Sequence, residues 1–215
     1  MHWTHLKEPR ISALFVLQRQ MLSVTDWLQK LSKPMNKKAK KSMVMNKNHL
    51  EVIVEDERWK TAENCQSKAR LIFDTALTYI DQNDLSPVIG FDKPIEINLA
   101  LSNNNEVHRL NAEFRGMDKP TNVLSFANID DEEFLDELDT AETVELGDII
   151  VALETLQSEA SQKNIPLENH FAHLLVHGIL HLFGYDHQTD SDADEMEGIE
   201  IKILTLLGIP NPYTE

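Results

Sequence analysis

The sequence predicts an α/β fold, in which a small mixed sheet of four strands packs with about five helices, one of them a histidine-rich helix beside the sheet. Two observations carry this prediction. Four short segments have the β-branched composition or the alternation of apolar and polar residues that strands show, and longer segments with apolar residues at helical spacing accompany them. Strands and helices that alternate along a chain are typical of α/β folds.

The first half of the predicted fold contains two strands and two helices. Residues 50–54 form a short β-branched strand, and residues 59–80 carry apolar residues at helical spacing. Residues 93–101 form the second strand, because apolar and polar residues alternate there as in a half-buried strand. Asn103 then caps a helix that runs to about Phe114, since its side chain can accept hydrogen bonds from the first free N–H groups.

The second half begins with two more strands, at residues 121–127 and 146–151, and we expect the latter to be buried on both faces. Between them, residues 130–145 contain nine carboxylates, which we interpret as a solvated loop rather than a metal site. Three helices complete the prediction. The first spans about residues 152–163, the second begins at Pro166, and the third begins near Ser191.

Charge divides the chain of 215 residues into two parts. Residues 1–45 hold nine Lys and Arg against Glu8 and Asp26, and we interpret this segment of net charge +7 as a basic, flexible N-terminal extension. The whole chain carries −16, so residues 46–215 carry −23. We expect this acidic part to form a single hydrolase domain, since its length suits one hydrophobic core.

Composition also limits the compartment and the partners. No apolar run approaches the roughly 20 residues that a membrane helix needs, so we expect no membrane span. A single cysteine, Cys65, cannot form an internal disulfide, which favours a cytoplasmic location. The strong negative charge argues against long-range attraction to a phosphate backbone, so an RNA-binding function would need a local positive site.

The most informative segment is rich in histidine: five of the nine histidines lie within residues 170–187. His177 and His181 are four residues apart, so on a helix their imidazoles project from the same side and can share one ion. Gly184 fits a helix C-terminus, where a left-handed residue lets the chain turn back. The turn after it can bring His187 against the same ion, which gives three nitrogen ligands and leaves one position open.

Three neutral imidazoles with an open fourth position are typical of a catalytic zinc site. Zinc in such a site lowers the pKa of a bound water towards about 7. His170 and His173 share the same helix face, but residues eight apart lie about 12 Å apart along the axis, so His173 and His181 cannot bind one ion. We interpret His170 and His173 as residues of one of three kinds: they support the metal ligands without binding the ion, they face the substrate, or they lie on the surface. Nickel, cobalt or manganese would also suit three imidazoles.

The segment from His177 to His187, His-Gly-Ile-Leu-His-Leu-Phe-Gly-Tyr-Asp-His, resembles the signature of the YbeY family, bacterial endoribonucleases of ribosomal RNA maturation. Residues 114–126 (Phe-Arg-Gly-Met-Asp-Lys-Pro-Thr-Asn-Val-Leu-Ser-Phe) resemble the second motif of that family, and residues 146–150 (Leu-Gly-Asp-Ile-Ile) the third. The resemblance covers about residue 50 to the C-terminus. One departure is Met117, which stands where lysine is common.

The resemblance implies a zinc-dependent endoribonuclease, specific for single-stranded RNA, that acts in 16S rRNA 3′-end maturation and in ribosome quality control. Its partners would be single-stranded RNA, rRNA and the small ribosomal subunit. The resemblance also implies that His177, His181 and His187 bind one Zn²⁺ and that Arg115 is the basic catalytic residue of the cleft. It implies neither a general base nor an oligomeric state.

Arg115 suits this role because its planar guanidinium can grip two phosphate oxygens at once. Together with Arg109 and Lys119 it would form the local positive site that RNA binding requires. The alternative is a surface salt bridge from Arg115, to Asp118 or to the acidic segment that follows.

Three other functions remain open. A zinc peptidase has the same ligand spacing, but in such enzymes a glutamate follows the first histidine as general base, and this chain has Gly178 there. A hydrolase of small molecules and a non-catalytic ribosome assembly factor with a structural zinc are the other two. Purified protein that cleaves unstructured protein, cleaves a model ester or binds ribosomes without catalysis would distinguish them.

A few polar residues near these motifs have plainer interpretations. Asp186 either orients a ligand imidazole or makes a turn. Ser125 could line the cleft, although the alternation of its strand accounts for it. We expect Glu197 and Glu200 on the solvated face of the last helix.

Overall fold

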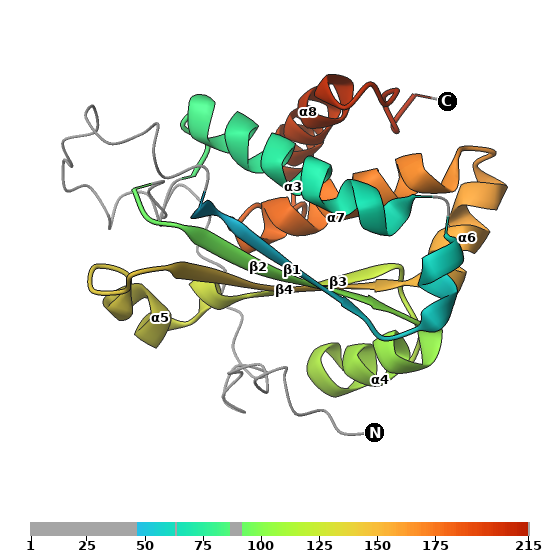
Figure 1. Ribbon diagram of the computed structural model, residues 1–215, viewed down its shortest axis with the longest axis horizontal. Coiled ribbons are helices and arrows are strands. Elements are labelled where there is room, and N and C mark those ends of the chain that lie inside the picture. Colours follow the sequence, from blue (N-terminus) through green and yellow to red (C-terminus); the bar gives the residue numbers. More distant parts are fainter. Residues whose placement is uncertain (1–46, 63, 87–91, 215) are drawn as a thin grey trace.

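The computed structural model describes residues 47–62, 64–86 and 92–214, and Figure 1 shows the arrangement of their helices and strands. The predicted N-terminal extension, residues 1–45, lies outside these described residues. Within them, no helix is both long enough and apolar enough to cross a bilayer.

The sheet has four strands in the order β1-β2-β4-β3. β1, β2 and β4 run parallel, and β3 pairs with β4 in the antiparallel direction, so the sheet is mixed as predicted. Most of β4 is buried, which agrees with the expected burial on both faces. The strands are β1 (His49–Val54), β2 (Ile95–Ser102), β3 (Val123–Ala127) and β4 (Val144–Ala152).

Six α-helices lie in the described part of the chain, against about five predicted. Helices α3, α7 and α8 lie on one side of the sheet and α4 lies on the other (Figure 1). Short 3-10 helices, η2 (Glu57–Thr61) and η3 (Asn128–Asp130), join some of the larger elements. The α-helices are α3 (Cys65–Gln82), α4 (Asn104–Arg115), α5 (Glu132–Glu137), α6 (Leu153–Gln162), α7 (Leu167–Leu182) and α8 (Asp190–Leu206).

Two sequence-based expectations about these helices were wrong. The single helix expected over residues 59–80 is divided, because Asn64 adopts a left-handed conformation (φ 65°) that no α-helix can contain. Trp59 instead lies in η2, buried, and its indole N–H donates to the Ser102 carbonyl at 2.7 Å. The acidic segment 130–145, expected to be a loop, contains the short helix α5.

The hydrophobic core has two layers, one on each face of the sheet. The larger layer packs α3, α7 and α8 against residues such as Leu99 and Ile149. The smaller one packs Val107 and Leu110 of α4 against the opposite face, where Ile150 points. Because side chains alternate along a strand, neighbouring residues of β4 serve the two layers in turn.

Gly147 allows the strands β3 and β4 to pair closely. Its φ is +134°, and a Cβ built there would lie 2.0 Å from the Phe126 carbonyl oxygen. The register between β2 and β4 also shifts at this point. Only glycine fits such a position, because any side chain would collide with the neighbouring strand.

Helix α7 lies at the centre of the larger layer, in contact with α3, α6, α8, β3 and β4. Gly178 faces the sheet, where a Cβ would lie 3.1 Å from Ile149 Cγ2 and 3.1 Å from Ser125 Oγ. The absence of a side chain at residue 178 therefore lets this helix lie close to β3 and β4. The rigid packing of α7 on both sides fixes the direction in which its polar side chains point.

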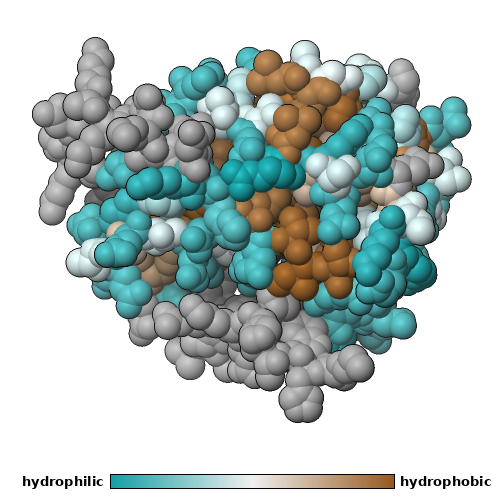
Figure 2. All heavy atoms as spheres, viewed as in Figure 1, coloured by the Kyte–Doolittle hydropathy of each residue, from teal (hydrophilic) through white to brown (hydrophobic). Residues whose placement is uncertain are grey.

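The outer surface is mostly polar. Figure 2 shows one face of the molecule, on which hydrophilic residues surround an apolar area near the centre. Among the described residues, the large hydrophobic side chains that are most exposed are Leu71, Met117, Leu206 and Tyr213.

Candidate metal centre

His177 and His181 lie on adjacent turns of α7, with their ring centroids 4.5 Å apart. Their Nε2 atoms approach to 3.0 Å. Both side chains are partly buried, because α7 is covered by its neighbours along most of its length. The spacing of four residues thus makes the two imidazole rings project from the same side of the helix, as the sequence predicts.

His187 reaches the same place through the turn that ends α7. Gly184 has φ +89°, a conformation that L side chains rarely adopt. The N–H groups of Gly184 and Tyr185 donate to the carbonyls of His181 and Leu180, the two hydrogen bonds of a Schellman motif. The chain then turns back, and the ring of His187 lies 5.3 Å from that of His177 and 5.2 Å from that of His181.

These three histidines form one group that can hold a metal ion. One ring nitrogen from each lies within 4.8 Å of the other two. Within the described segments, no other group of at least three His, Cys, Asp or Glu side chains meets this criterion. Asp186 does not hold a ring: its Oδ1 accepts a hydrogen bond from the His187 backbone N–H at 2.8 Å, so the turn interpretation holds for this contact.

The Nδ1 atoms of the two helical histidines are held by other groups. His181 Nδ1 lies 2.9 Å from the Tyr185 carbonyl oxygen, which can only accept, so this nitrogen carries the proton. His177 Nδ1 lies 2.7 Å from Glu200 Oε1 and donates to it. When both rings are neutral, each presents the lone pair of its Nε2, and the two lone pairs face one another across 3.0 Å. This arrangement is the one that metal-ligating histidines usually show.

Burial keeps His181 neutral. Desolvation, together with charge repulsion from the nearby His177 and His187, lowers its pKa to about 4. A neutral imidazole is the form that binds a metal ion. At neutral pH this ring is thus already deprotonated on Nε2.

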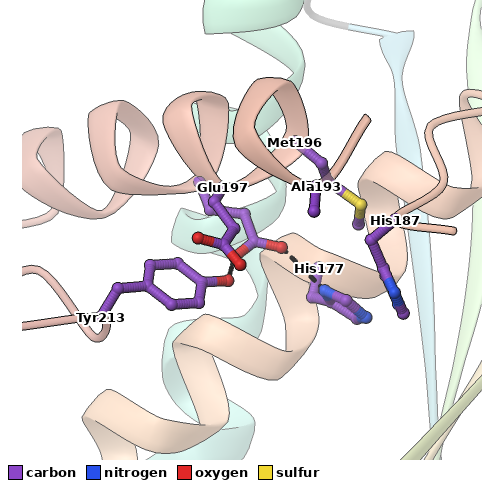
Figure 3. Close-up of a pocket in the computed structure, with 7 residues that line it drawn as sticks. His177, His187, Ala193, Met196, Glu197 and Tyr213 are labelled. Carbon is purple, nitrogen blue, oxygen red and sulfur yellow. Dashed lines mark hydrogen bonds and ion pairs between the residues drawn. The ribbon is translucent and has the colours of Figure 1, made fainter. Parts of the chain in front are cut away.

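A cavity of about 320 Å³ opens beside the histidines. Figure 3 shows that α8, the end of α7 and the C-terminal segment surround it, with the rings of His177 and His187 on one side and Tyr213 on the other. Its size is at the lower end of the range for small-molecule sites. The residues that line it are His177, His187, Ala193, Met196, Glu197, Glu200 and Tyr213.

The family model described as Endoribonuclease YbeY matches residues 54–208, which include all three histidines. The chain belongs to the YbeY family. The resemblance seen in the sequence is confirmed, and the match ends at residue 208 rather than at the C-terminus.

Several curated relatives carry the name Endoribonuclease YbeY. The protein of Acinetobacter baumannii is 49% identical over 128 residues, which are 59% of this chain and 79% of the relative. That of Sinorhizobium fredii is 40% identical over 164 residues, 76% of this chain and 91% of the relative. The protein of Allorhizobium ampelinum is 36% identical over 171 residues, 79% of this chain and 96% of the relative. The predicted enzyme class, an endoribonuclease-type hydrolase, is thereby confirmed for the family.

Solved structures were matched as well. A solution structure of a Thermotoga maritima protein aligns with 78% of this chain and 100% of its own chain, at 22% identity and a TM-score of 0.42.

Arg115, the other site residue that the resemblance implies, is not among the residues that line the cavity beside the histidines. It is an exposed residue at the end of α4. Helix α4 lies on the side of the sheet opposite to α7 (Figure 1). In the described part of the chain no hydrogen bond or ion pair connects Arg115 to the histidine cluster, and Asp118 pairs with His108 instead. Arg109 forms ion pairs with Glu106 and Glu113, so its charge is largely neutralised. The local positive site is therefore weaker than the sequence suggests, and the role of Arg115 stays a prediction.

His170 is not a surface residue, as one interpretation had it. It is 1% exposed, and its Nε2 lies 2.7 Å from Glu159 Oε2 of α6. Asn122, just before β3, donates to the same carboxylate at 2.9 Å. This network joins α6, α7 and the start of β3, away from the proposed metal ligands.

The expectation for Glu200 was wrong. Its side chain is completely buried and contacts His173, His177 and Tyr213. Burial alone would raise the pKa of this carboxyl, but the hydrogen bonds from the three side chains outweigh it and hold the pKa at about 2. Glu197 is half-buried and lines the cavity.

A signal for Glu200 exists in the sequence. In α8 the buried residues Met196, Ile199 and Ile203 are three or four positions apart, and Glu200 lies on that same face. A carboxylate among core positions must have a partner, because an unpaired buried charge is costly.

Proposed function

We propose that this YbeY-family chain is a metal-dependent endoribonuclease that cleaves single-stranded RNA, with one zinc ion on His177, His181 and His187. The observation that carries the proposal is the convergence of three ring nitrogens. Two of them, the Nε2 atoms of His177 and His181, lie 3.0 Å apart with their lone pairs facing each other. Two unprotonated nitrogens so close repel one another, and a shared cation removes that repulsion.

The donor set fits zinc. Nitrogen ligands lie about 2.0 to 2.1 Å from zinc, so two corners of a tetrahedron around it are about 3.3 Å apart. The separation of the two Nε2 atoms is of this size. A bound zinc ion would act as a Lewis acid towards a phosphoryl oxygen and would lower the pKa of a bound water.

The residues of the chain then have separate roles. Glu200 and the Tyr185 carbonyl hold two of the rings in orientation, and burial keeps His181 unprotonated. The cavity beside His177 and His187 receives the part of the substrate next to the scissile bond. We keep Arg115 as the residue that binds a phosphate and stabilises its charge, because its exposed guanidinium is free of internal ion pairs within the described residues.

The family suggests the biological substrate. We propose that the chain acts on rRNA in 16S 3′-end maturation and ribosome quality control, with the small ribosomal subunit as partner. The name Endoribonuclease YbeY of the relatives supports an RNA substrate. A cytoplasmic location, which the single cysteine favours, belongs to the same proposal.

Gly178 weakens the peptidase alternative further. A residue at this position faces Ile149 and Ser125 of the sheet, so a glutamate there would point into packed structure. The general base that follows the first histidine in zinc peptidases thus has no room at the corresponding place in this fold.

One experiment tests metal and substrate together. Elemental analysis of the purified full chain should give one zinc per molecule, and the protein should cleave a single-stranded RNA, lose this activity with a chelator and regain it with zinc. A double-stranded RNA of the same sequence, casein and a model ester serve as control substrates. Zinc-free protein with full ribonuclease activity would refute the metal site, and cleavage of casein or ester alone would refute the ribonuclease.

A further inference from the structure

A buried carboxylate lies behind one of the proposed ligands. Glu200 is 0% exposed, and the described part of the chain contains no acidic side chain more deeply buried. Its two oxygens are both used: Oε1 faces His177 Nδ1 at 2.7 Å, and Oε2 faces His173 Nε2 at 3.0 Å. The carboxylate therefore joins two histidines of α7 to α8.

Tyr213 completes the arrangement from the C-terminal segment. Its hydroxyl donates to Glu200 Oε2 and lies 3.2 Å from His173 Nε2. The rings of Tyr213 and His173 also pack edge to face, with centroids 5.4 Å apart. Figure 3 shows Tyr213 across the cavity from His177 and His187. The third-last residue of the chain thus holds a group that is central to the site.

We propose that Glu200, held in place by His173 and Tyr213, is a positioning residue that fixes the ring orientation and tautomer of His177, so that its Nε2 faces the nitrogens of His181 and His187. A carboxylate that accepts from Nδ1 leaves only Nε2 for a ligand. An apolar residue would satisfy the packing of α8 at lower desolvation cost, so the buried charge points to this orienting role.

The inference rests on the proposed function for one of its two measurements, which is zinc affinity. The other measurement, the tautomer of His177, needs no metal. In metal-free protein, at a pH where the ring is neutral, ¹⁵N NMR should show His177 as the Nδ1–H tautomer. In Glu200→Met, which keeps the length of the side chain but removes the acceptor, His177 should become a mixture of both tautomers.

Zinc affinity, measured by competition with a chelator, is the other readout. Losing such a supporting group weakens metal binding by about 10- to 100-fold. We expect a loss of this size in Glu200→Met and a smaller one in Glu200→Gln, whose amide oxygen can still accept from Nδ1. Tyr213→Phe, which removes one hydroxyl from a half-exposed ring, should weaken zinc binding by about 3- to 10-fold.

Glu195→Gln is the matched control, because it makes the same change on the exposed part of α8 and should leave both readouts unchanged. Unchanged zinc affinity and an unchanged His177 tautomer in folded Glu200→Met would overturn the proposal, even if its melting temperature fell. If Glu200→Met does not fold, wild-type zinc affinity in both Glu200→Gln and Tyr213→Phe would overturn it. A parent protein that binds no metal would refute the proposed function. In that case the tautomer of His177, compared between the parent and Glu200→Met, still decides whether Glu200 positions the ring.

Discussion

The Nε2 atoms of His177 and His181 lie 3.0 Å apart, while the Nδ1 atom of each ring is held by another group. Neither ring can turn away without losing a part-buried hydrogen bond. The pair is therefore preorganised for a shared cation before any cation arrives. Such preorganisation reduces the ordering that metal binding would otherwise require.

From this geometry we expect His181→Ala to abolish stoichiometric zinc. Zinc at 100 times its dissociation constant should stabilise the parent protein by about 2.7 kcal/mol, because it binds the folded state alone, and should not stabilise the variant. His108→Ala is the control, since His108 pairs with Asp118 on the opposite side of the sheet. Elemental analysis and thermal unfolding measure both effects. Full zinc content in His181→Ala would remove this residue from the ligand set.

The stability of the metal-free protein should depend on pH through His181. Its folded-state pKa of about 4 lies below the ordinary 6.5, so the unfolded chain binds a proton more readily between these values. Stability contributed by the neutral ring is present above pH 6.5, falls as the pH falls through this window, and is fully lost below about 4. Urea unfolding of metal-free parent and His181→Gln across the window should show a smaller slope in the variant. Equal slopes would contradict the depressed pKa.

Arg115→Ala should reduce cleavage of single-stranded RNA while zinc content and melting temperature stay near those of the parent. The expectation follows from its exposed guanidinium, which stabilises no described ion pair but can bind a phosphate. Loss of one electrostatic stabiliser commonly costs about 10²- to 10³-fold in kcat. Lys202→Ala, on the exposed part of α8, controls for the loss of a positive charge. Cleavage rates that persist in Arg115→Ala would exclude its catalytic role.

The parts of the site that the sequence predicted depend on short-range geometry. The four-residue spacing of His177 and His181 and the left-handed Gly184 specify local backbone conformations, and the structure has both. The expected half-buried strand is found only at the start of β2, where Ile95 and Ile97 are buried and the residues between them are partly buried, because from Leu99 onward both faces of β2 are covered. Local patterns of this kind need no knowledge of distant residues.

The residues that were missed depend on contacts between distant segments. Glu200 reaches His177 only because α8 packs against α7, and Tyr213 arrives from the end of the chain. The division of the first long helix at Asn64 also arises from tertiary packing, since burial of Trp59 under β2 favours a separate turn there. Helical spacing alone cannot reveal such a break.

The close approach of α7 to the sheet makes Gly178 sensitive to added volume. A Cβ would lie 3.1 Å from both Ile149 Cγ2 and Ser125 Oγ, so Gly178→Ala must displace packed atoms and should cost about 1 to 3 kcal/mol. Gly198→Ala is the matched control in α8, where a Cβ meets nothing within 4 Å. That variant should be more stable than the parent by about 0.5 to 1 kcal/mol. Chemical denaturation compares them, and equal stabilities would contradict the packing argument.

Asn122 connects the start of β3 to the helices. Its amide donates to Glu159 Oε2 at 2.9 Å, its Oδ1 accepts from the Val123 N–H at 2.7 Å, and Glu159 in turn pairs with the buried His170. Asn122→Ala leaves part-buried partners of this network unsatisfied, so we expect a loss of about 1 to 3 kcal/mol in the free energy of unfolding.

Ser125→Ala, three residues along the same segment, should behave in the opposite way. Its hydroxyl oxygen is buried and has no hydrogen-bond partner among the described residues, and removing such a group is neutral or stabilising. Urea unfolding of the two metal-free variants measures the contrast directly. A destabilised Ser125→Ala would show that this hydroxyl has a partner, and an unchanged Asn122→Ala would show that the network of His170 and Glu159 does not hold β3 against α7.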